Sequence, residues 1–260
     1  MIPPVMPQIV KELQTVVDKA NATADELSAV IEKDPVIALR LVSISNSPIY
    51  RGMMENRTVR QAIPRLGLKE TMSVVVAIAN KSLYETKNPH YRFLMDKLWA
   101  HAIATAYAAK LIARQLKRGD ADVYFLMGLT HDIGKMLLLK AFSEDPAVKS
   151  VEMKLVIANI REVYLGVSSI MLKRWGFNEG FIQAVSQSEK NEFDAGASRE
   201  CLVVNLANMI TRTIGYSLLE GSAPEPVNMR SAQLLGVPPE AIKTLGEETL
   251  ALIKDLPHLF

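Results

Sequence analysis

The sequence predicts an all-α fold. Apolar residues recur with the three- and four-residue spacing of amphipathic helices along most of the chain. Capping residues, glycines and prolines divide these stretches into segments of helical length. No convincing pair of alternating strands and no internal repeat interrupts the pattern.

Composition places the chain among ordinary soluble proteins. Its 260 residues are 49% hydrophobic and 22% charged, and the net charge of +2 gives no strong attraction to nucleic acid or anionic membrane. The single cysteine, Cys201, excludes an internal disulfide. No apolar run reaches the roughly 18 residues of a membrane span, and residues 1–10 lack a secretory signal. We therefore expect a cytoplasmic protein that does not bind membranes.

Capping signals define the helices of the first third of the chain. The first helix is expected over 8–19. The starts of the next three are marked by Thr23 with Glu26, Asp34 with Pro35, and Thr58 with Gln61. Pro64 predicts a kink or an early end of the last of these, which Gly67 closes.

Residues 69–83 allow two interpretations. Three consecutive valines, residues 74–76, would suit a β-strand. The apolar positions extend over more residues than an ordinary strand, and no partner strand is visible. We therefore expect a helix.

The longest helix is expected over 91–118, with Gly119 at its end and His101 beside its apolar stripe. The turn signals at 87–89 place a lobe boundary there, giving an N-terminal lobe of 1–88 and a second lobe of 89–260. Further helices are expected from 121, over 152–165 and 167–175 with a break near Gly166, and over 179–188, 199–219, 228–236 and from 239.

The pair His131–Asp132 lies where the helix that starts after Asp120 should end, because Gly134 permits a turn. Neighbouring side chains at the end of a helix can flank one point in space. An imidazole and a carboxylate placed in this way are plausible metal ligands, with Lys135 nearby as a potential phosphate contact. In the alternative interpretation, the two side chains hydrogen-bond to each other and cap a buried helix end.

Taken in order, these segments resemble the HDOD family, the HD-related output domain of bacterial signalling proteins. The resemblance covers most of the chain. It rests on the segments IPPVMPQIVKEL, IEKDPVIALRLVSISNSPIY, TVRQAIPRLGLKE, LWAHAIATA, FLMGLTHDIGKMLLL, LKRWGFNEGFIQAV and VVNLANMI. It implies an N-terminal helical bundle packed against a degenerate HD-like bundle, together one HDOD module, and a role in bacterial signal transduction.

The related HD enzymes are metal-dependent phosphohydrolases, and the resemblance carries their ligands onto this chain one at a time. The first histidine matches His101, and the His-Asp pair matches His131 and Asp132. The closing aspartate falls on Asn208, a neutral amide that replaces carboxylate poorly. The imidazole positions of a second metal site fall on Tyr164, Ser188 and Glu189.

Three first-site candidates therefore remain: His101, His131 and Asp132. They could hold a single weakly bound divalent metal, or they could form a buried hydrogen-bonded cluster without a cofactor. We favour the cluster, because buried polar groups need partners whether or not a metal is present. The expected function is a non-catalytic regulatory module that contacts a protein partner. The alternative is a mononuclear phosphohydrolase acting on a nucleotide or cyclic dinucleotide.

A second alternative, a DNA-binding regulator, rests on a basic concentration near a helix–turn–helix-like segment. Its members are Arg51, Arg57, Arg60, Arg65 and Lys69. We favour a solvated face, because the global charge is near neutral.

The methionines and tryptophans are interpreted as packing residues of the core. They are Met53, Met54, Met127, Met136, Trp99 and Trp175.

Overall fold

The computed structural model describes residues 8–17, 23–50, 52–117, 119–148, 151–217 and 225–254. All regular structure in these ranges is helical, which confirms the all-α prediction. The described residues form two compact units, one up to Leu83 and one from Tyr84 to Lys254. The sequence places its lobe boundary five residues later, between 88 and 89.

The N-terminal unit contains five helices: α1 (Gln8–Val17), α2 (Ala24–Ile31), α3 (Pro35–Ser45), α4 (Val59–Leu66) and α5 (Leu68–Lys81). Helix α5 packs against α1, α3 and α4, and its residues 73–80 are all buried. The helical interpretation of 69–83 is therefore confirmed. Its three valines point in different directions around the helix and are all buried. A helix that is buried all round has the apolar composition of a buried strand.

The three predicted caps of this unit all form, but only the first is a complete capping box. Thr23 and Glu26 form both bonds of the capping box, and the Asp34 carboxylate accepts the first two backbone N–H groups of α3. Thr58 caps α4 through the N–H of Gln61. Pro64 does not end α4, which continues for two residues.

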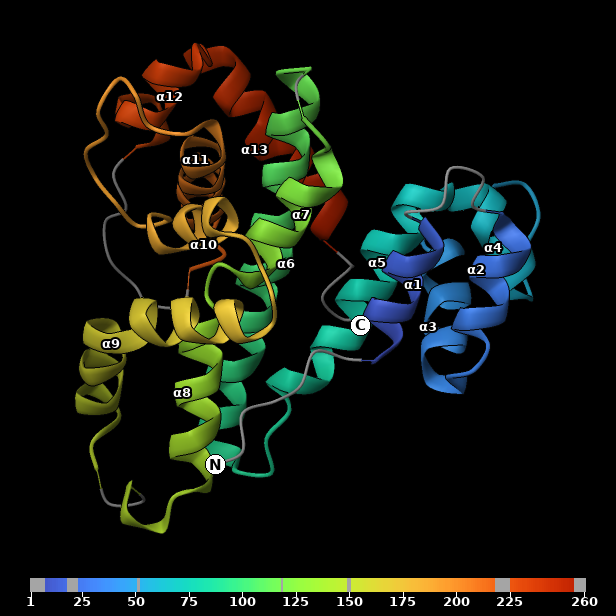
Figure 1. Cartoon of the computed structure of the whole chain (residues 1–260), viewed down its shortest axis with the longest axis horizontal. Helices are drawn as coiled ribbons and strands as arrows, with labels where there is room; N and C mark the ends of the chain where they lie inside the picture. The colour runs from blue at the N-terminus through green and yellow to red at the C-terminus, as the bar shows by residue number, and fades with distance from the viewer. Residues whose placement is uncertain are drawn as a thin grey trace. The chain divides into compact units, whose positions relative to one another are not determined.

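The second unit surrounds α6 (Pro89–Gln115), the longest described helix. Figure 1 shows α6 running through this unit, and α7, α8, α11 and α13 all pack against it. The other helices are α7 (Ala121–Thr130), α8 (Ile133–Glu144), α9 (Met153–Arg174), α10 (Glu179–Ser186), α11 (Arg199–Thr213), α12 (Arg230–Leu235) and α13 (Pro239–Ile253). Short 3-10 turns lie at Ser82–Tyr84, Pro146–Val148 and Pro226–Asn228.

Helix α6 ends at Gln115, three residues before its predicted end at 118. Residue 118 lies outside the described residues. The cap of α6 is Leu116, and Lys117 and Gly119 then adopt positive φ angles of 51° and 77°. Glycine tolerates this conformation without strain, so Gly119 serves the turn after the helix. His101 is buried at 3% exposure, as its position beside the apolar stripe predicts.

The predicted break of α9 near Gly166 is wrong, because α9 is one continuous helix. A glycine inside a helix costs about 1 kcal/mol relative to alanine, which is too little to end a helix that packs against neighbours. Figure 1 shows that α9 nevertheless changes direction along its length. Within the described ranges, α9 is also the one helix long and apolar enough to cross a membrane, a weak signal that core helices share.

Two later boundaries also differ from the sequence prediction. Helix α11 ends at Thr213 and not at residue 219. Asn228 lies in a 3-10 turn, so the residue that precedes α12 is Met229. Gly236 does close α12 in the left-handed conformation.

The packing prediction holds for only some of the large side chains. Met127, Met136 and Trp99 are buried, and Trp175 is half-buried. Met53 and Met54 are fully or largely exposed, at 104% and 79%, so their interpretation as gap-fillers is wrong. They lie in the loop between α3 and α4, where the helical periodicity that identifies core positions does not apply.

Candidate metal centre

The sequence-predicted pair lies at the junction of two helices. Asp120 caps α7 through the N–H of Asp122, and α7 ends at Thr130 with His131 as its C-cap residue. Asp132 then precedes the first residue of α8. The side chains of His131 and Asp132 meet that of His101 from α6, and all three are at most 3% exposed. The structure therefore brings together the three predicted ligands.

Backbone carbonyls fix the orientation of both imidazoles. His101 Nδ1 lies 2.6 Å from the carbonyl oxygen of Tyr216, and His131 Nδ1 lies 2.7 Å from that of Gly128. A carbonyl only accepts hydrogen bonds, so each Nδ1 carries a proton. When the rings are neutral, both Nε2 atoms therefore present lone pairs. Histidine ligands of metals are commonly oriented in this way by an acceptor on the other nitrogen.

The two Nε2 atoms and one oxygen of Asp132 form a small triangle. The Nε2 atoms are 3.0 Å apart, and Asp132 Oδ2 lies 3.6 Å from His101 Nε2 and 3.5 Å from His131 Nε2. A circle through three atoms at these separations has a radius of about 2.0 Å, the length of a bond from a zinc-like ion to nitrogen or oxygen. The residues therefore fit a single divalent ion.

The charges of the triangle are complementary to a cation at its centre. Two lone pairs and a carboxylate oxygen converge, and no described residue donates a hydrogen bond to Asp132 Oδ2. Burial and the neighbouring His131 lower the pKa of His101 to about 4, which opposes a proton on that ring at neutral pH. Burial alone would raise the pKa of Asp132, but His131, Lys135 and His101 together hold it below its usual range. A hydrogen-bonded cluster thus needs an additional proton, whereas a metal ion supplies the charge directly.

The second oxygen of Asp132 is already paired with a cation. Lys135 Nζ lies 2.9 Å from Asp132 Oδ1 and 2.6 Å from Glu189 Oε1, and 4.4 Å from the centre of the Tyr164 ring. Burial would lower the pKa of Lys135, but the two carboxylates raise it. Lys135 is 7% exposed, so it neutralises two carboxylates here and is not presented to a phosphate in solution.

The remaining positions named from the family also gather near this pair. Glu189 and Tyr164 contact Lys135, as described above, while the backbone carbonyl of Ser188 accepts a hydrogen bond from Asn208 Nδ2 at 3.0 Å. Asn208 is fully buried, and its Oδ1 accepts no hydrogen bond within the described residues. A neutral amide oxygen is available there, but not the charge of a carboxylate.

Sequence reasoning missed the groups that orient the site. The carbonyls of Tyr216 and Gly128 carry no residue-type signature, so no pattern could have identified them. Sequence reasoning also gave Gly134 the wrong role. Gly134 lies inside α8 without a positive φ, and its N–H donates to Ser168 Oγ at 3.0 Å. A Cβ at Gly134 would overlap the carbonyl oxygen of Tyr164, so close packing of α8 against α9 requires the glycine.

The family model described as HDOD domain matches residues 3–191. No curated protein matches the chain. Solved structures share the fold, among them the following three. An HDOD domain protein with unknown function from Geobacter sulfurreducens is 22% identical, with 100% of this chain and 94% of that chain covered and a TM-score of 0.75.

The second structure is a "putative metal-dependent phosphohydrolase" from Shewanella amazonensis SB2B, at 19% identity, 97% and 93% coverage and a TM-score of 0.73. The third is a "putative signal transduction protein" from Marinobacter aquaeolei VT8, at 18% identity, 99% and 59% coverage and a TM-score of 0.72. At these identities the likeness shows the fold alone. The family match, which covers most of the chain, shows that this protein belongs to the HDOD domain family.

Proposed function

We propose that this protein is a non-catalytic regulatory module of signal transduction that acts through contacts with other proteins, and that its His101–His131–Asp132 cluster holds one divalent cation. The observation that carries the proposal is a set of three converging ligand atoms that is closed to solvent. The module acts in the cytoplasm and does not act on membranes or nucleic acid.

The cation has a structural role in this proposal. His101 belongs to α6, and His131 and Asp132 join α7 to α8, so one ion would cross-link three consecutive helices. An ion at this position could in principle lower the pKa of a bound water. In this site, which excludes water, the ion would instead compensate the electrostatic repulsion between the two lone pairs and the carboxylate.

Three features oppose hydrolysis. A phosphoester cannot reach ligands that are at most 3% exposed without opening of the bundle. Asn208 supplies no charge to a metal, and the ammonium group of Lys135 is held by Asp132 and Glu189. One feature favours the second candidate, a mononuclear phosphohydrolase: the ligand triangle has the size that a catalytic ion would need.

Nucleic-acid binding has less support. Arg51 lies outside the described residues. Arg65 donates hydrogen bonds to the carbonyl of Met54 and to Asn46 Oδ1, so this member of the basic concentration holds a loop of its own unit. Arg57 and Arg60 remain exposed, as expected for a solvated face.

The catalytic alternative is tested by assaying protein loaded with manganese, iron or magnesium against phosphomonoesters, nucleotides and cyclic dinucleotides. We expect no turnover above the rate of the Asp132→Ala variant, because the ligands are closed to solvent and Asn208 supplies no second carboxylate. Turnover by the wild type that disappears in Asp132→Ala would establish an enzyme and overturn the non-catalytic proposal. Circular dichroism of the variant must show a retained fold.

The substitution Asn208→Asp is expected to tighten binding of Mn²⁺ or Co²⁺ by about tenfold or more, because a second carboxylate adds charge to a buried site. Isothermal titration calorimetry on metal-stripped protein measures the change. Asn205→Asp is the matched control, since Asn205 lies one turn earlier on α11, is equally buried and donates to the same carbonyl of Ser188. Equal affinities of the wild type and Asn208→Asp would place Asn208 outside the coordination sphere.

A further inference from the structure

The two oxygen atoms of Asp132 face two different cation positions. Its Oδ2 atom belongs to the ligand triangle with His101 and His131. Its Oδ1 atom lies 2.9 Å from Nζ of Lys135. Two-metal sites place their ions about 3.5–4 Å apart, and a carboxylate with one cation on each oxygen can bridge them. Asp132 is therefore arranged as a bridging carboxylate whose second cation is the lysine ammonium group.

Lys135 is enclosed by groups that attract a cation. Its Nζ atom donates to Glu189 Oε1 at 2.6 Å and lies 4.4 Å from the centre of the Tyr164 ring. Its side chain is only 9% exposed. A buried charge is stable only where it is paired, and the negative face of an aromatic ring adds to the attraction. The enclosure therefore favours positive charge, whether an ammonium group or a metal ion carries it.

Glu189 is held in place by two buried asparagines of α11. Asn205 Nδ2 donates to the carbonyls of Ser188 and Lys190, at 3.1 and 2.9 Å. Asn208 Nδ2 also donates to the carbonyl of Ser188, at 3.0 Å. The backbone on both sides of Glu189 is thus fixed from α11. The position of its carboxylate is a property of the fold and not of a free surface side chain.

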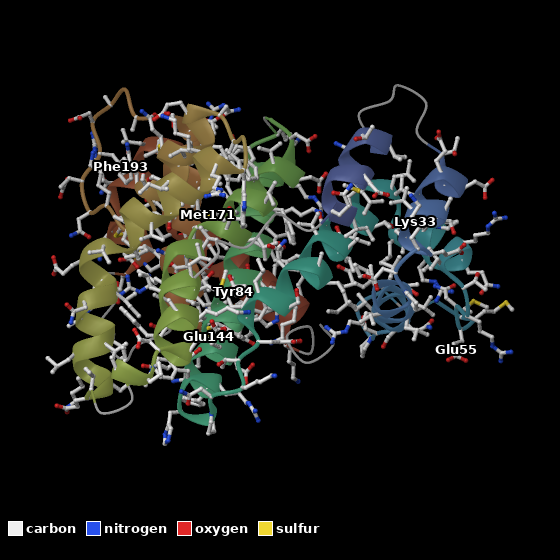
Figure 2. All side chains as sticks on the ribbon, turned by 60° about the horizontal axis from the view of Figure 1, so that its bottom comes forward. Lys33, Glu55, Tyr84, Glu144, Met171 and Phe193 are labelled. Atoms are coloured by element: carbon white, nitrogen blue, oxygen red, sulfur yellow. The ribbon has the colours of Figure 1, made fainter. Side chains whose placement is uncertain are left out.

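The same segment carries buried oxygen atoms that accept no hydrogen bond. Ser188 and Asn208 are fully buried, and Ser188 Oγ and Asn208 Oδ1 have no partner within the described ranges. Figure 2 shows Phe193 in the loop that follows, where its side chain is 5% exposed, so this loop packs onto the second unit. Buried oxygen atoms without donors are available to a hard cation. The neighbourhood of Glu189 therefore has more oxygen atoms than one ammonium group uses.

The positions that the resemblance assigns to the imidazoles of a second metal site do not fit such a site. Tyr164, Ser188 and Glu189 stand there, and the carboxylate of Glu189 is already bound by Lys135. A divalent ion in the triangle and this ammonium group together more than neutralise Asp132 and Glu189. A second divalent ion would add uncompensated charge to a buried site, which is costly.

We propose that the ammonium group of Lys135 is a tethered cation that occupies the second cation position, so that this protein binds one divalent ion and excludes another. Lys135 is thus a specificity-determining residue of the metal centre. The inference rests on the proposed function, which supplies the ion of the triangle. A small neutral side chain at position 135 should then open a second site for a divalent ion between Asp132 and Glu189.

The number of Mn²⁺ ions bound by metal-stripped protein after equilibrium dialysis tests the proposal. We expect Lys135→Ala to bind one more ion per chain than the wild type, because the truncation leaves polar space for an ion and water between the two carboxylates. Lys135→Arg keeps a cation and should bind as many ions as the wild type. The double variant Lys135→Ala with Glu189→Gln loses a ligand and should lose the additional ion.

Electron paramagnetic resonance shows where the additional ion binds. An ion that Asp132 bridges to the ion of the triangle is magnetically coupled to it. The spectrum of Lys135→Ala should therefore lose the hyperfine pattern of an isolated Mn²⁺ ion, which the wild type should keep. An additional ion that leaves the pattern of isolated ions, or that the double variant retains, lies elsewhere on the protein and would overturn the proposal.

The wild-type count separates this inference from the proposed function. A wild type that binds no Mn²⁺ would refute the proposed metal centre, while an ion gained by Lys135→Ala and lost again with Glu189→Gln would still establish the second position. A wild type that binds one ion and a Lys135→Ala variant that also binds one would leave the metal centre standing and overturn the tethered cation.

Glu189→Gln decides the question if circular dichroism shows that Lys135→Ala does not fold with or without Mn²⁺. The side chain of Glu189 is 34% exposed, so this variant should fold. Lys135 would then draw on Asp132 alone, and the affinity for the ion of the triangle should fall about tenfold. Glu192→Gln is the matched control, since it is the same change at an exposed residue of the same loop. Equal Mn²⁺ affinities of the two variants in calorimetric titration would overturn the proposal.

Discussion

Removal of divalent cations with a chelator is expected to lower the melting temperature of the wild-type protein by about 10 °C, and added Mn²⁺, Zn²⁺ or Co²⁺ should restore it. A ligand at 1,000 times its dissociation constant stabilises the folded state by about 4 kcal/mol, which corresponds to this shift in a chain of this size. The structural reason is the triangle of His101, His131 and Asp132, whose lone pairs and carboxylate converge without a hydrogen donor. Thermal melts with and without chelator provide the measurement.

His131→Ala should abolish this response, because it removes one of three ligands. The readout is the response to metal and not the absolute melting temperature, since the loss of a buried imidazole also destabilises the fold. His90→Ala is the matched control: His90 is exposed, so its variant should respond as the wild type does. A wild type indifferent to chelator and to added ions would show that the cluster is held by a proton, as the sequence interpretation favours.

The sequence was sufficient to predict most of the helices because their signals are local, although α8 was not predicted as a separate helix and α9 was predicted as two. The bonds of Thr23 with Glu26 and of Asp34 with α3 are short-range, and so each was predicted from neighbouring residues. The three candidate ligands were also predicted, although only the family resemblance joined His101 to the pair at 131–132. Their convergence depends on how α6 packs against α7, which no local pattern specifies.

The errors arise where one residue type serves several purposes. Met53 and Met136 have the same side chain, yet one is fully exposed in a loop and the other is fully buried in α8. Glycine is equally ambiguous: Gly119 serves a turn with positive φ, Gly134 a close approach of helices, and Gly166 neither. Composition cannot separate these roles, because each depends on what surrounds the residue in space.

The substitution Gly134→Ala is expected to destabilise the protein by about 3 kcal/mol or more, at the upper end of overpacking effects. The added methyl group would overlap the carbonyl of Tyr164 and the hydroxyl of Ser168, and helix α8 would have to move away from α9. That movement would break the hydrogen bond from Gly134 N to Ser168 Oγ. It would also displace Asp132, which precedes α8, so the variant should bind divalent ions more weakly than the wild type. Urea unfolding and calorimetric titration measure the two effects.

Gly166→Ala is the control that separates close packing from a general effect of the added methyl group. Gly166 is exposed within α9, and a Cβ there would meet nothing within 4 Å. Alanine is favoured over glycine inside a helix by about 1 kcal/mol, so this variant should be as stable as the wild type or more stable. A Gly134→Ala variant with wild-type stability would show that α8 and α9 do not approach closely. A destabilised Gly166→Ala variant would show that the change of direction in α9 requires a glycine.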